Sequence, residues 1–367
     1  MVEEGSGRVQ SLVEAGISQV PPQYIQPPES RPGPPQAPHS SEFPCIDLSE
    51  TDRDRDRVRE AIGKACLEWG AFHVTNHGVP VGLLDRIRSL SHSFFEDLSL
   101  PEKLNYACDP SSPASQGYGT RMLLPPSPSP SPSPSQDNHN NQDDTFVLDW
   151  RDYFDHHTLP LSRRDPSRWP HYPPSYREVV AQYSDEMGEL ARRLMGLISE
   201  SVGMGISRIE DAVGGEIYQN VTVSYYPPCP QPDLTLGLQS HSDMGLITLL
   251  IQDDDVEGLQ LFKDNQWVTL HPLPHAILVL LSDQIEIITN GKYRSAQHRA
   301  ITNSHRPRLS VATFHDPPKT TTISPAPDLL TPSSPPRYRP VNYGHYVSSW
   351  YSKGPKGKRN LDALLLI

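Results

Sequence analysis

The pattern of apolar and polar positions changes character along the chain. Apolar residues at 176, 179, 180, 183, 187, 190, 194, 197 and 198 have the spacing of one buried helix face, which predicts a long helix over 176–203. Between 215 and 320, short apolar runs alternate with Gly, Pro, Asn and Asp. Such regularly spaced short strands are typical of a barrel or a double-sheet jelly roll. The expected strands include "LITLLIQ", "AILVLLSDQIEIITNG" and "RLSVATFHDPP".

The segment 41–175 has mixed character. A short strand, an amphipathic helix and the strand "AFHVTNHG" follow one another, and a second helix carries Leu83, Leu84, Ile87 and Phe94 at helical spacing. This predicts an N-terminal α/β region attached to a mainly β protein with flanking helices. Residues 1–40 are proline-rich and predict an extended, weakly packed arm, and residues 321–367 predict a tail with a final helix.

Residues 125–144 read "PPSPSPSPSPSQDNHNNQDD" and contain no apolar group to bury. Burial cannot offset the entropy of ordering such a segment, so it predicts a disordered surface insertion. A Ser-Pro run can also be phosphorylated or bind a partner domain, and that alternative stays open beside the passive loop.

Composition narrows the class of protein. The net charge of −12 disfavours nucleic-acid binding, because nothing would neutralise the phosphates, and favours small-molecule substrates. Four widely spaced cysteines indicate neither a zinc site nor a disulfide framework. No signal peptide and no apolar run long enough to cross a bilayer is evident. We therefore expect a cytoplasmic protein with possible nuclear access, without membrane association and monomeric.

The stretch "LQSHSDMGLITLLIQ" carries the first candidate chemistry. His241 and Asp243 stand two positions apart, so their side chains can converge from one face of a strand. His298, in "YRSAQHRAIT", lies on another predicted strand and supplies a third ligand. Two histidines and one carboxylate match the facial triad of non-haem Fe(II) oxygenases, which leaves positions open for a bidentate cosubstrate and oxygen.

An anchor for that cosubstrate follows ten residues later. Arg308 and Ser310, in "RPRLSVATF", point to the same side of a strand. A guanidinium beside a hydroxyl suits the far carboxylate of a short diacid. The order H-x-D, H, R-x-S therefore describes a metal and a charged anchor.

With these motifs the chain resembles the plant Fe(II)/2-oxoglutarate-dependent dioxygenases, the family of anthocyanidin synthase, flavonol synthase, gibberellin oxidases and jasmonate-induced oxygenases. The resemblance extends over nearly the whole chain outside 125–144. Segments that carry it include "ACLEWGAFHVTNHGVP", "LDWRDYF", "YYPPCPQPDLTLGLQSHSD", "VEGLQLFKDNQWVTLHPLP" and "NGKYRSAQHRAITN".

The resemblance implies a double-stranded β-helix core with catalytic iron on His241, Asp243 and His298. It also implies 2-oxoglutarate held by Arg308, Ser310 and Tyr226, with O2 as oxidant and ascorbate as reductant. Such an enzyme would hydroxylate or desaturate a small plant metabolite, flavonoid, phenolic or hormone-like, and release succinate and CO2.

Three positions depart from the family pattern. Ser224 stands where the family usually has an asparagine that helps to bind the cosubstrate, and the shorter serine predicts a lost or water-mediated contact. Leu280 and Ser282 replace the usual asparagine and glycine of "N-x-G-D-Q". These changes are expected to alter the pocket or the cosubstrate affinity rather than abolish the chemistry.

The substrate contacts are inferred from the resemblance alone. Phe314, Tyr118 and residues of "DYFDH" are expected to line the pocket, although ordinary core positions remain an alternative. Members that act on acids such as jasmonate need a cationic clamp, whereas the candidate positions hold Thr222 and Val347. We therefore expect a neutral phenolic or other apolar substrate rather than jasmonate.

Other readings stay open at this level. An iron oxidase of the same fold that needs no 2-oxoglutarate, such as aminocyclopropane-carboxylate oxidase, is one. A non-catalytic protein that binds a metabolite or partner on the dioxygenase scaffold is another, and a jelly-roll storage protein is a third. The charged groups gathered around one centre argue against the last two readings, because a scaffold without chemistry does not need them.

Overall fold

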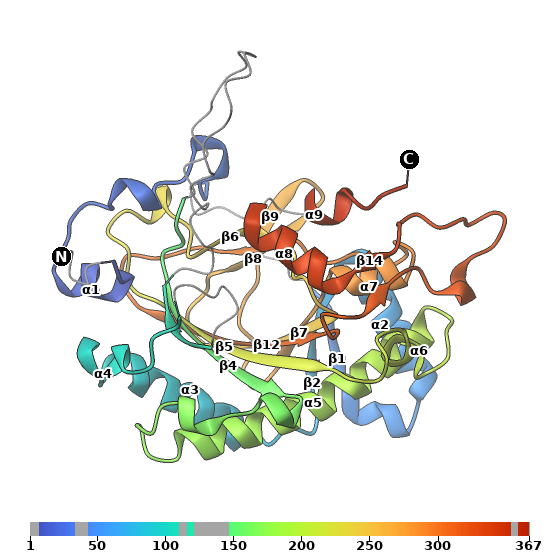
Figure 1. The fold of residues 1–367 in the computed structure, drawn as a ribbon, viewed down its shortest axis with the longest axis horizontal. Helices are drawn as coiled ribbons and strands as arrows, with labels where there is room; N and C mark the ends of the chain where they lie inside the picture. The colour runs from blue at the N-terminus through green and yellow to red at the C-terminus, as the bar shows by residue number, and fades with distance from the viewer. Residues whose placement is uncertain (1–6, 34–42, 110–115, 121–146, 354–358, 367) are drawn as a thin grey trace, which may run out of the picture.

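The protein is described by a computed structural model that covers residues 7–33, 43–109, 116–120, 147–353 and 359–366 (Figure 1). Its centre is an eight-stranded sheet with the order β1-β2-β10-β7-β12-β5-β4-β3. The strands are β1 Cys45–Asp47, β2 Ala71–Thr75, β3 Gly117–Gly119, β4 Asp152–Leu159, β5 Tyr218–Tyr226, β7 Ile247–Gln252, β10 Ile277–Leu281 and β12 Arg308–Asp316.

A four-stranded sheet with the order β6-β11-β8-β9 forms the second layer. Its strands are β6 Leu238–His241, β8 Leu259–Lys263, β9 Gln266–Thr269 and β11 His298–Ala300. A short pair, β13 Thr322–Ile323 and β14 Val341–Asn342, lies outside both sheets. The two layers form the double-stranded β-helix that the sequence predicts. The strands of 41–175 and of 215–320 share the large sheet, so the two predicted segments are one structural unit.

The alternation along β12 shows how the sheet separates core from cavity. Leu309, Val311 and Thr313 are buried, whereas Ala312 and Phe314 between them are partly accessible. Successive side chains of a strand point to opposite faces, and the accessible set lines a cavity. The other face packs against helices.

The helices that cover this outer face lie together along one side of the large sheet (Figure 1). The longest, α5 Tyr176–Ser201, is the helix that the apolar spacing predicts over 176–203. Burial of its apolar stripe, rather than propensity alone, stabilises a helix in this position. The helices that pack together there are α2 Arg55–Glu68, α3 Val81–Glu96 and α5. The other α-helices of the described residues are α1 Val9–Glu14, α4 Leu100–Leu104, α6 Arg208–Ala212, α7 Asp283–Ile288, α8 Tyr343–Lys353 and α9 Arg359–Asp362.

The expectation of a weakly packed arm over 1–40 is wrong for the part that the structure describes. Val9 and Tyr24 are buried in a small core with Trp150 and Cys229. The backbone N–H groups of Val9 and Gln10 donate to the carboxylate of Asp152 at 3.1 and 3.0 Å. Prolines limit hydrogen bonding within the arm, but the apolar residues between them still bury their side chains.

Two further expectations need correction. The run "AILVLLSDQIEIITNG" is not one strand, because β10 ends at Leu281 and α7 begins at Asp283. Both halves are buried, and periodicity does not separate a buried strand from a buried helix in so short a run. The expected strand "RLSVATFHDPP" ends at Asp316 as β12, because the two prolines that follow cannot donate to the ladder, and His315 within it is 1% exposed.

The expected insertion at 125–144 lies outside the described residues. Among the helices of the described ranges, none combines the length and the apolar character that a membrane crossing requires.

A charged cluster joins α3 to the end of β7. The imidazole of His92 lies 2.9 Å from both a Glu96 and an Asp253 carboxylate oxygen. Burial alone would lower the pKa of His92, but hydrogen bonds and charge attraction from the two carboxylates outweigh it and raise the pKa to about 9. The Asp253 carboxylate also accepts a hydrogen bond from the backbone N–H of Leu309 at 2.7 Å, so the cluster stabilises the start of β12.

We predict that His92→Gln removes a pH-dependent part of the stability. Because the folded-state pKa of His92 is raised above 6.5, its stabilisation is complete below pH 6.5 and is lost as the pH rises through about 9. The variant should lose about 1–3 kcal/mol of unfolding free energy at pH 6 and almost nothing at pH 10. Denaturant melts across this range measure the difference, with exposed His305→Gln as control. A difference that is independent of pH would contradict the assignment.

Candidate active site

Three side chains converge at one end of the cavity between the two sheets. His241 closes β6, and its Cα partner in the neighbouring strand β11 is His298. Asp243 follows in the turn after β6. Its Oδ1 lies 3.5 Å from His241 Nε2 and 3.8 Å from His298 Nε2, and the three ligand atoms lie within 4.8 Å of one another. All three side chains are buried.

Hydrogen bonds orient both imidazoles for metal binding. Nδ1 of His241 lies 2.8 Å from the carbonyl oxygen of Gln239, and Nδ1 of His298 lies 3.0 Å from that of Ala296. These contacts assign the proton to Nδ1 and leave the Nε2 lone pairs facing Asp243.

The charges at this point suit a divalent cation. Burial lowers the pKa of His298 to about 4, so the ring is neutral at pH 7. Burial would raise the pKa of Asp243, but the two imidazoles and the Thr248 hydroxyl, which donates at 2.6 Å, outweigh it and lower the pKa to about 2. Two imidazoles and one carboxylate on a single face are the donor set of a non-haem Fe(II) site.

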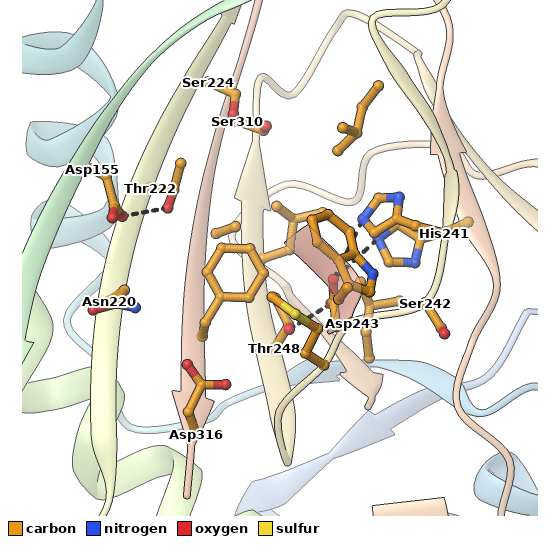
Figure 2. Close-up of a pocket in the computed structure, with 18 of the residues that line it drawn as sticks. Asp155, Asn220, Thr222, Ser224, His241, Ser242, Asp243, Thr248, Ser310 and Asp316 are labelled. Atoms are coloured by element: carbon orange, nitrogen blue, oxygen red, sulfur yellow. Dashed lines mark hydrogen bonds and ion pairs between the residues drawn. The ribbon is translucent and has the colours of Figure 1, made fainter. Parts of the chain in front are cut away.

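The cavity beside the triad has a volume of about 340 Å³. Arg308, Ser310, Tyr226 and Ser224 line one region of it, and the ladder between β12 and β5 pairs Arg308 with Tyr226 and Ser310 with Ser224. The Arg308 guanidinium carbon lies 5.1 Å from the centroid of the Tyr226 ring. Figure 2 shows the two serines together, apart from His241.

This region is rich in donors that lack acceptors. Nη2 of Arg308 donates to Gln252 at 2.7 Å, but its Nε and Nη1 are buried without a partner in the described part of the chain. A buried charged donor left unpaired is costly. A carboxylate from a ligand would complete it, so these residues fit the 2-oxoglutarate that the family uses.

Close backbone packing positions Arg308. A Cβ at Gly258 would lie 2.7 Å from Arg308 Cδ and 2.9 Å from Nε. Glycine is therefore required at position 258 if Arg308 is to keep this place.

The three departures from the family pattern have different local settings. Ser224 accepts a hydrogen bond from Arg151 Nη1 at 3.0 Å, so its hydroxyl has a cationic partner that the sequence did not reveal. Leu280 forms part of the apolar cavity wall. Ser282 has a φ of −111° at the start of α7, a conformation that does not need glycine.

The structure brings most of the expected substrate residues to the cavity and excludes one. Phe314, Thr222 and Val347 line it. Tyr118 does not, because its partner across the ladder is Phe154, which faces the helices. Tyr118 is fully buried there and contacts Phe94 and Asp152. Its expected role in substrate binding is therefore wrong.

Polar residues also line the sheet that carries the serines, toward the other end of β5 and β12: Asp155 belongs to the expected "DYFDH" segment, whereas Asn220 and Asp316 were not expected from the sequence. Asp155, Asn220 and Asp316 come from adjacent strands β4, β5 and β12 and line the cavity, and Figure 2 shows them on the side away from His241. Asp155 accepts a hydrogen bond from Thr222 at 2.7 Å. The period-two alternation of β4 and β12 was the signal that could have found them.

The C-terminal helix α8 closes one side of the cavity with Val347, Trp350 and Tyr351. It is fixed by the hydroxyl of Tyr346, which donates to Asp283 on α7 at 2.6 Å. The backbone N–H of Asp283 donates to the carbonyl of Asp243 at 2.9 Å. The helix and the metal ligand are therefore connected through one residue.

Comparisons with known proteins agree with this geometry. The family model described as "2OG-Fe(II) oxygenase superfamily" matches residues 218–317, and "non-haem dioxygenase in morphine synthesis N-terminal" matches residues 43–175. The chain belongs to the 2-oxoglutarate- and Fe(II)-dependent oxygenases, and His241, Asp243 and His298 are its facial triad.

Two groups of plant enzymes are among its relatives. The chain is 38% identical to jasmonate-induced oxygenase 4 of Arabidopsis thaliana over 98% of this chain and 96% of that protein. It is 34% identical to leucoanthocyanidin dioxygenase of Malus domestica over 93% and 94%. Among solved structures, "JOX2 in complex with 2OG, Fe, and JA" has a TM-score of 0.86 at 36% identity and covers 98% of both chains.

We predict that His241→Ala weakens Fe(II) binding at least about 100-fold, because losing a direct ligand costs more than losing an outer partner. Anaerobic titration of the apo-protein with Fe(II) and then 2-oxoglutarate, followed by the visible metal-to-ligand charge-transfer band, measures this. The band should require both additions in the wild type and be absent in the variant. Exposed His271→Ala is the matched control. An unchanged band in His241→Ala would exclude this site.

Proposed function

We propose that this enzyme uses O2 to hydroxylate or desaturate a small plant metabolite, a flavonoid or related phenolic, and that the same O2 oxidises 2-oxoglutarate to succinate and CO2. The main supporting observation is the cavity itself, which holds the metal triad, a cationic anchor at one end of β5 and β12, and hydrogen-bond acceptors at their other end. Bound iron and 2-oxoglutarate supply the oxidising chemistry. The chain's own residues hold the cosubstrate, orient the substrate and exclude water.

The proposed cosubstrate anchor is Arg308, with Ser310 and Tyr226 as hydroxyl donors and Ser224 beside them. Its support is the unpartnered nitrogens of Arg308. In the described part of the chain, the hydroxyls of Ser310 and Tyr226 likewise have no hydrogen-bond partner within the protein, and both residues line the cavity. A guanidinium and two hydroxyls together satisfy a carboxylate with charge-assisted hydrogen bonds.

The substrate class is inferred from the residues that line the cavity at the end of β5 and β12 away from Arg308. Thr222 donates to Asp155 rather than offering a cation, and Val347 is apolar. Asp155 and Asp316 are themselves acids, and burial raises their pKa values to about 7 and about 6. A ligand carboxylate placed there would meet like charge, whereas a phenolic hydroxyl would find acceptors.

The cations near these carboxylates, Arg163 and Lys319, already have partners in the protein. The Arg163 guanidinium lies 4.8 Å from the centroid of the Tyr218 ring and donates to the carbonyl of Leu159 at 3.2 Å. It also interacts electrostatically with Asp155 and Asp316. Lys319 also lines the cavity and interacts electrostatically with Asp316, so two cations face two carboxylates in this region. Apolar Phe314, Leu250 and Val347 complete a surface suited to an aromatic ring.

Several further expectations belong to the same proposal. We propose that ascorbate keeps the iron reduced, that the enzyme works as a monomer, and that it acts in the cytoplasm with access to the nucleus. A non-catalytic role on the same scaffold is disfavoured because every triad and anchor residue is present. Succinate formation separates the proposed reaction from that of an oxidase that needs no 2-oxoglutarate.

For the cosubstrate anchor, we predict that Gly258→Ala raises the dissociation constant of 2-oxoglutarate about tenfold, because the added Cβ displaces Arg308 and weakens a charged hydrogen bond. Fe(II) affinity should not change. The charge-transfer titration reports both constants. Gly82→Ala is the control, because a Cβ at that position meets nothing within 4 Å. Equal cosubstrate affinity in the two variants would argue against Arg308 as the anchor.

For the substrate, we predict that the best hydroxylated aromatic in a metabolite screen exceeds jasmonic acid in kcat/KM by at least about tenfold, or roughly 1.4 kcal/mol. Between pH 6 and pH 8, Asp155 and Asp316 ionise, so the KM for jasmonic acid should rise while that for a neutral phenol does not. Succinate release measures both. Efficient jasmonic acid turnover that is independent of pH would contradict the proposed substrate class but not the proposed reaction class.

For the acceptor wall, Asp316→Asn should raise the KM for the phenol severalfold and leave the KM for 2-oxoglutarate unchanged. Asp328→Asn, an exposed residue paired with Arg208, is the control.

A further inference from the structure

The serine that replaces the usual family asparagine is paired with an arginine. Arg151 precedes β4, is 3% exposed and lines the cavity. Its Nη1 donates to Ser224 Oγ at 3.0 Å, and its guanidinium carbon lies 5.5 Å from the centroid of the Tyr153 ring.

The contact with Arg151 determines which hydrogen bonds the Ser224 hydroxyl can still make. A hydroxyl has one proton to donate and accepts through its lone pairs. Arg151 supplies the donor to Ser224 Oγ, and within the described residues this hydroxyl has no other hydrogen-bond partner. Its own proton therefore remains available toward the cavity, where Ser310 lies opposite in the ladder.

The cations near Ser224 indicate that its hydroxyl donates to an anionic group. 2-Oxoglutarate brings two carboxylates into a buried site, and buried charges need partners of opposite sign. Arg308 supplies one cation on the Ser310 side, and Arg151 supplies a second on the Ser224 side. Donation from a guanidinium also polarises the hydroxyl, which strengthens its own donation to an anion.

We propose that Arg151 is a positioning residue for the cosubstrate. It orients and polarises the Ser224 hydroxyl as a donor to a 2-oxoglutarate carboxylate, and the pair takes the place of the family's asparagine. This inference rests on the family's cosubstrate and not on the substrate proposed above. The short side chain of Ser224 is thus a partner of Arg151 and not a defect in the site.

The test is a set of variants titrated anaerobically with Fe(II) and 2-oxoglutarate. Arg151→Met and Ser224→Ala should each raise the dissociation constant of 2-oxoglutarate about tenfold, with Fe(II) affinity unchanged. Because both act through one contact, the double variant should be no weaker than either single variant. Ser224→Asn placed in the Arg151→Met background should restore most of the affinity. Arg192→Met, an exposed arginine of α5, is the matched control.

Melting curves establish that each variant is folded, and if Arg151→Met does not fold, Arg151→Lys with Ser224→Ala completes the cycle. Wild-type 2-oxoglutarate affinity in a folded Arg151 variant, or additive losses in the double variant, would overturn the proposal. In either case the charge-transfer band of the wild type still reports whether the cosubstrate site works. Failure of this inference is therefore distinguishable from failure of the proposed reaction.

Discussion

The buried carboxylate of Asp243 is the group on which the rest of the site depends. Its side chain stands between His241 and His298 and accepts the hydroxyl of Thr248. Its backbone carbonyl accepts the N–H of Asp283 at the start of α7. One residue therefore fixes the turn after β6, the facing pair of histidines and the start of the helix that supports α8. A carboxylate held this way needs a cation, and the surrounding fold places two imidazole ligands beside it and no arginine or lysine partner among the described residues.

The cavity has a polarity that follows from strand order. β12 and β5 run antiparallel with Arg308 opposite Tyr226 at one end and Asp316 opposite Tyr218 at the other. Arg308 and hydroxyl donors gather at the first end, whereas the carboxylates Asp155 and Asp316 gather at the second with Arg163 and Lys319 as counter-charges. Between them, Phe314 and Leu250 provide an apolar middle. A diacid cosubstrate and the proposed hydroxyl-bearing aromatic substrate would thus have separate places in one chamber.

Local spacing in the sequence was sufficient for the parts of the site that lie on single strands. H-x-D and R-x-S each need only the strand period, and the apolar spacing of α5 was equally plain. Contacts set by pairing between distant strands were not accessible. Tyr118 was misplaced because its face depends on its register with Phe154, and Arg151 was missed because nothing near it in the chain indicates Ser224. That Asp155 and Asp316 line the same cavity follows only from the sheet order, in which β4 and β12 lie on either side of β5.

The N-terminal arm, residues 7–33, stabilises a buried carboxylate, which its high proline content does not predict. The N–H groups of Val9 and Gln10 complete the buried carboxylate of Asp152, whose neighbour in the chain is Arg151. On the opposite side, Tyr346 completes Asp283. The segments matched by the family models, 43–175 and 218–317, contain both acids but neither set of donors. The two segments that the family models match are thus smaller than the unit that folds. An exchange of modules between relatives would have to carry the arm and the final helix along with the catalytic core.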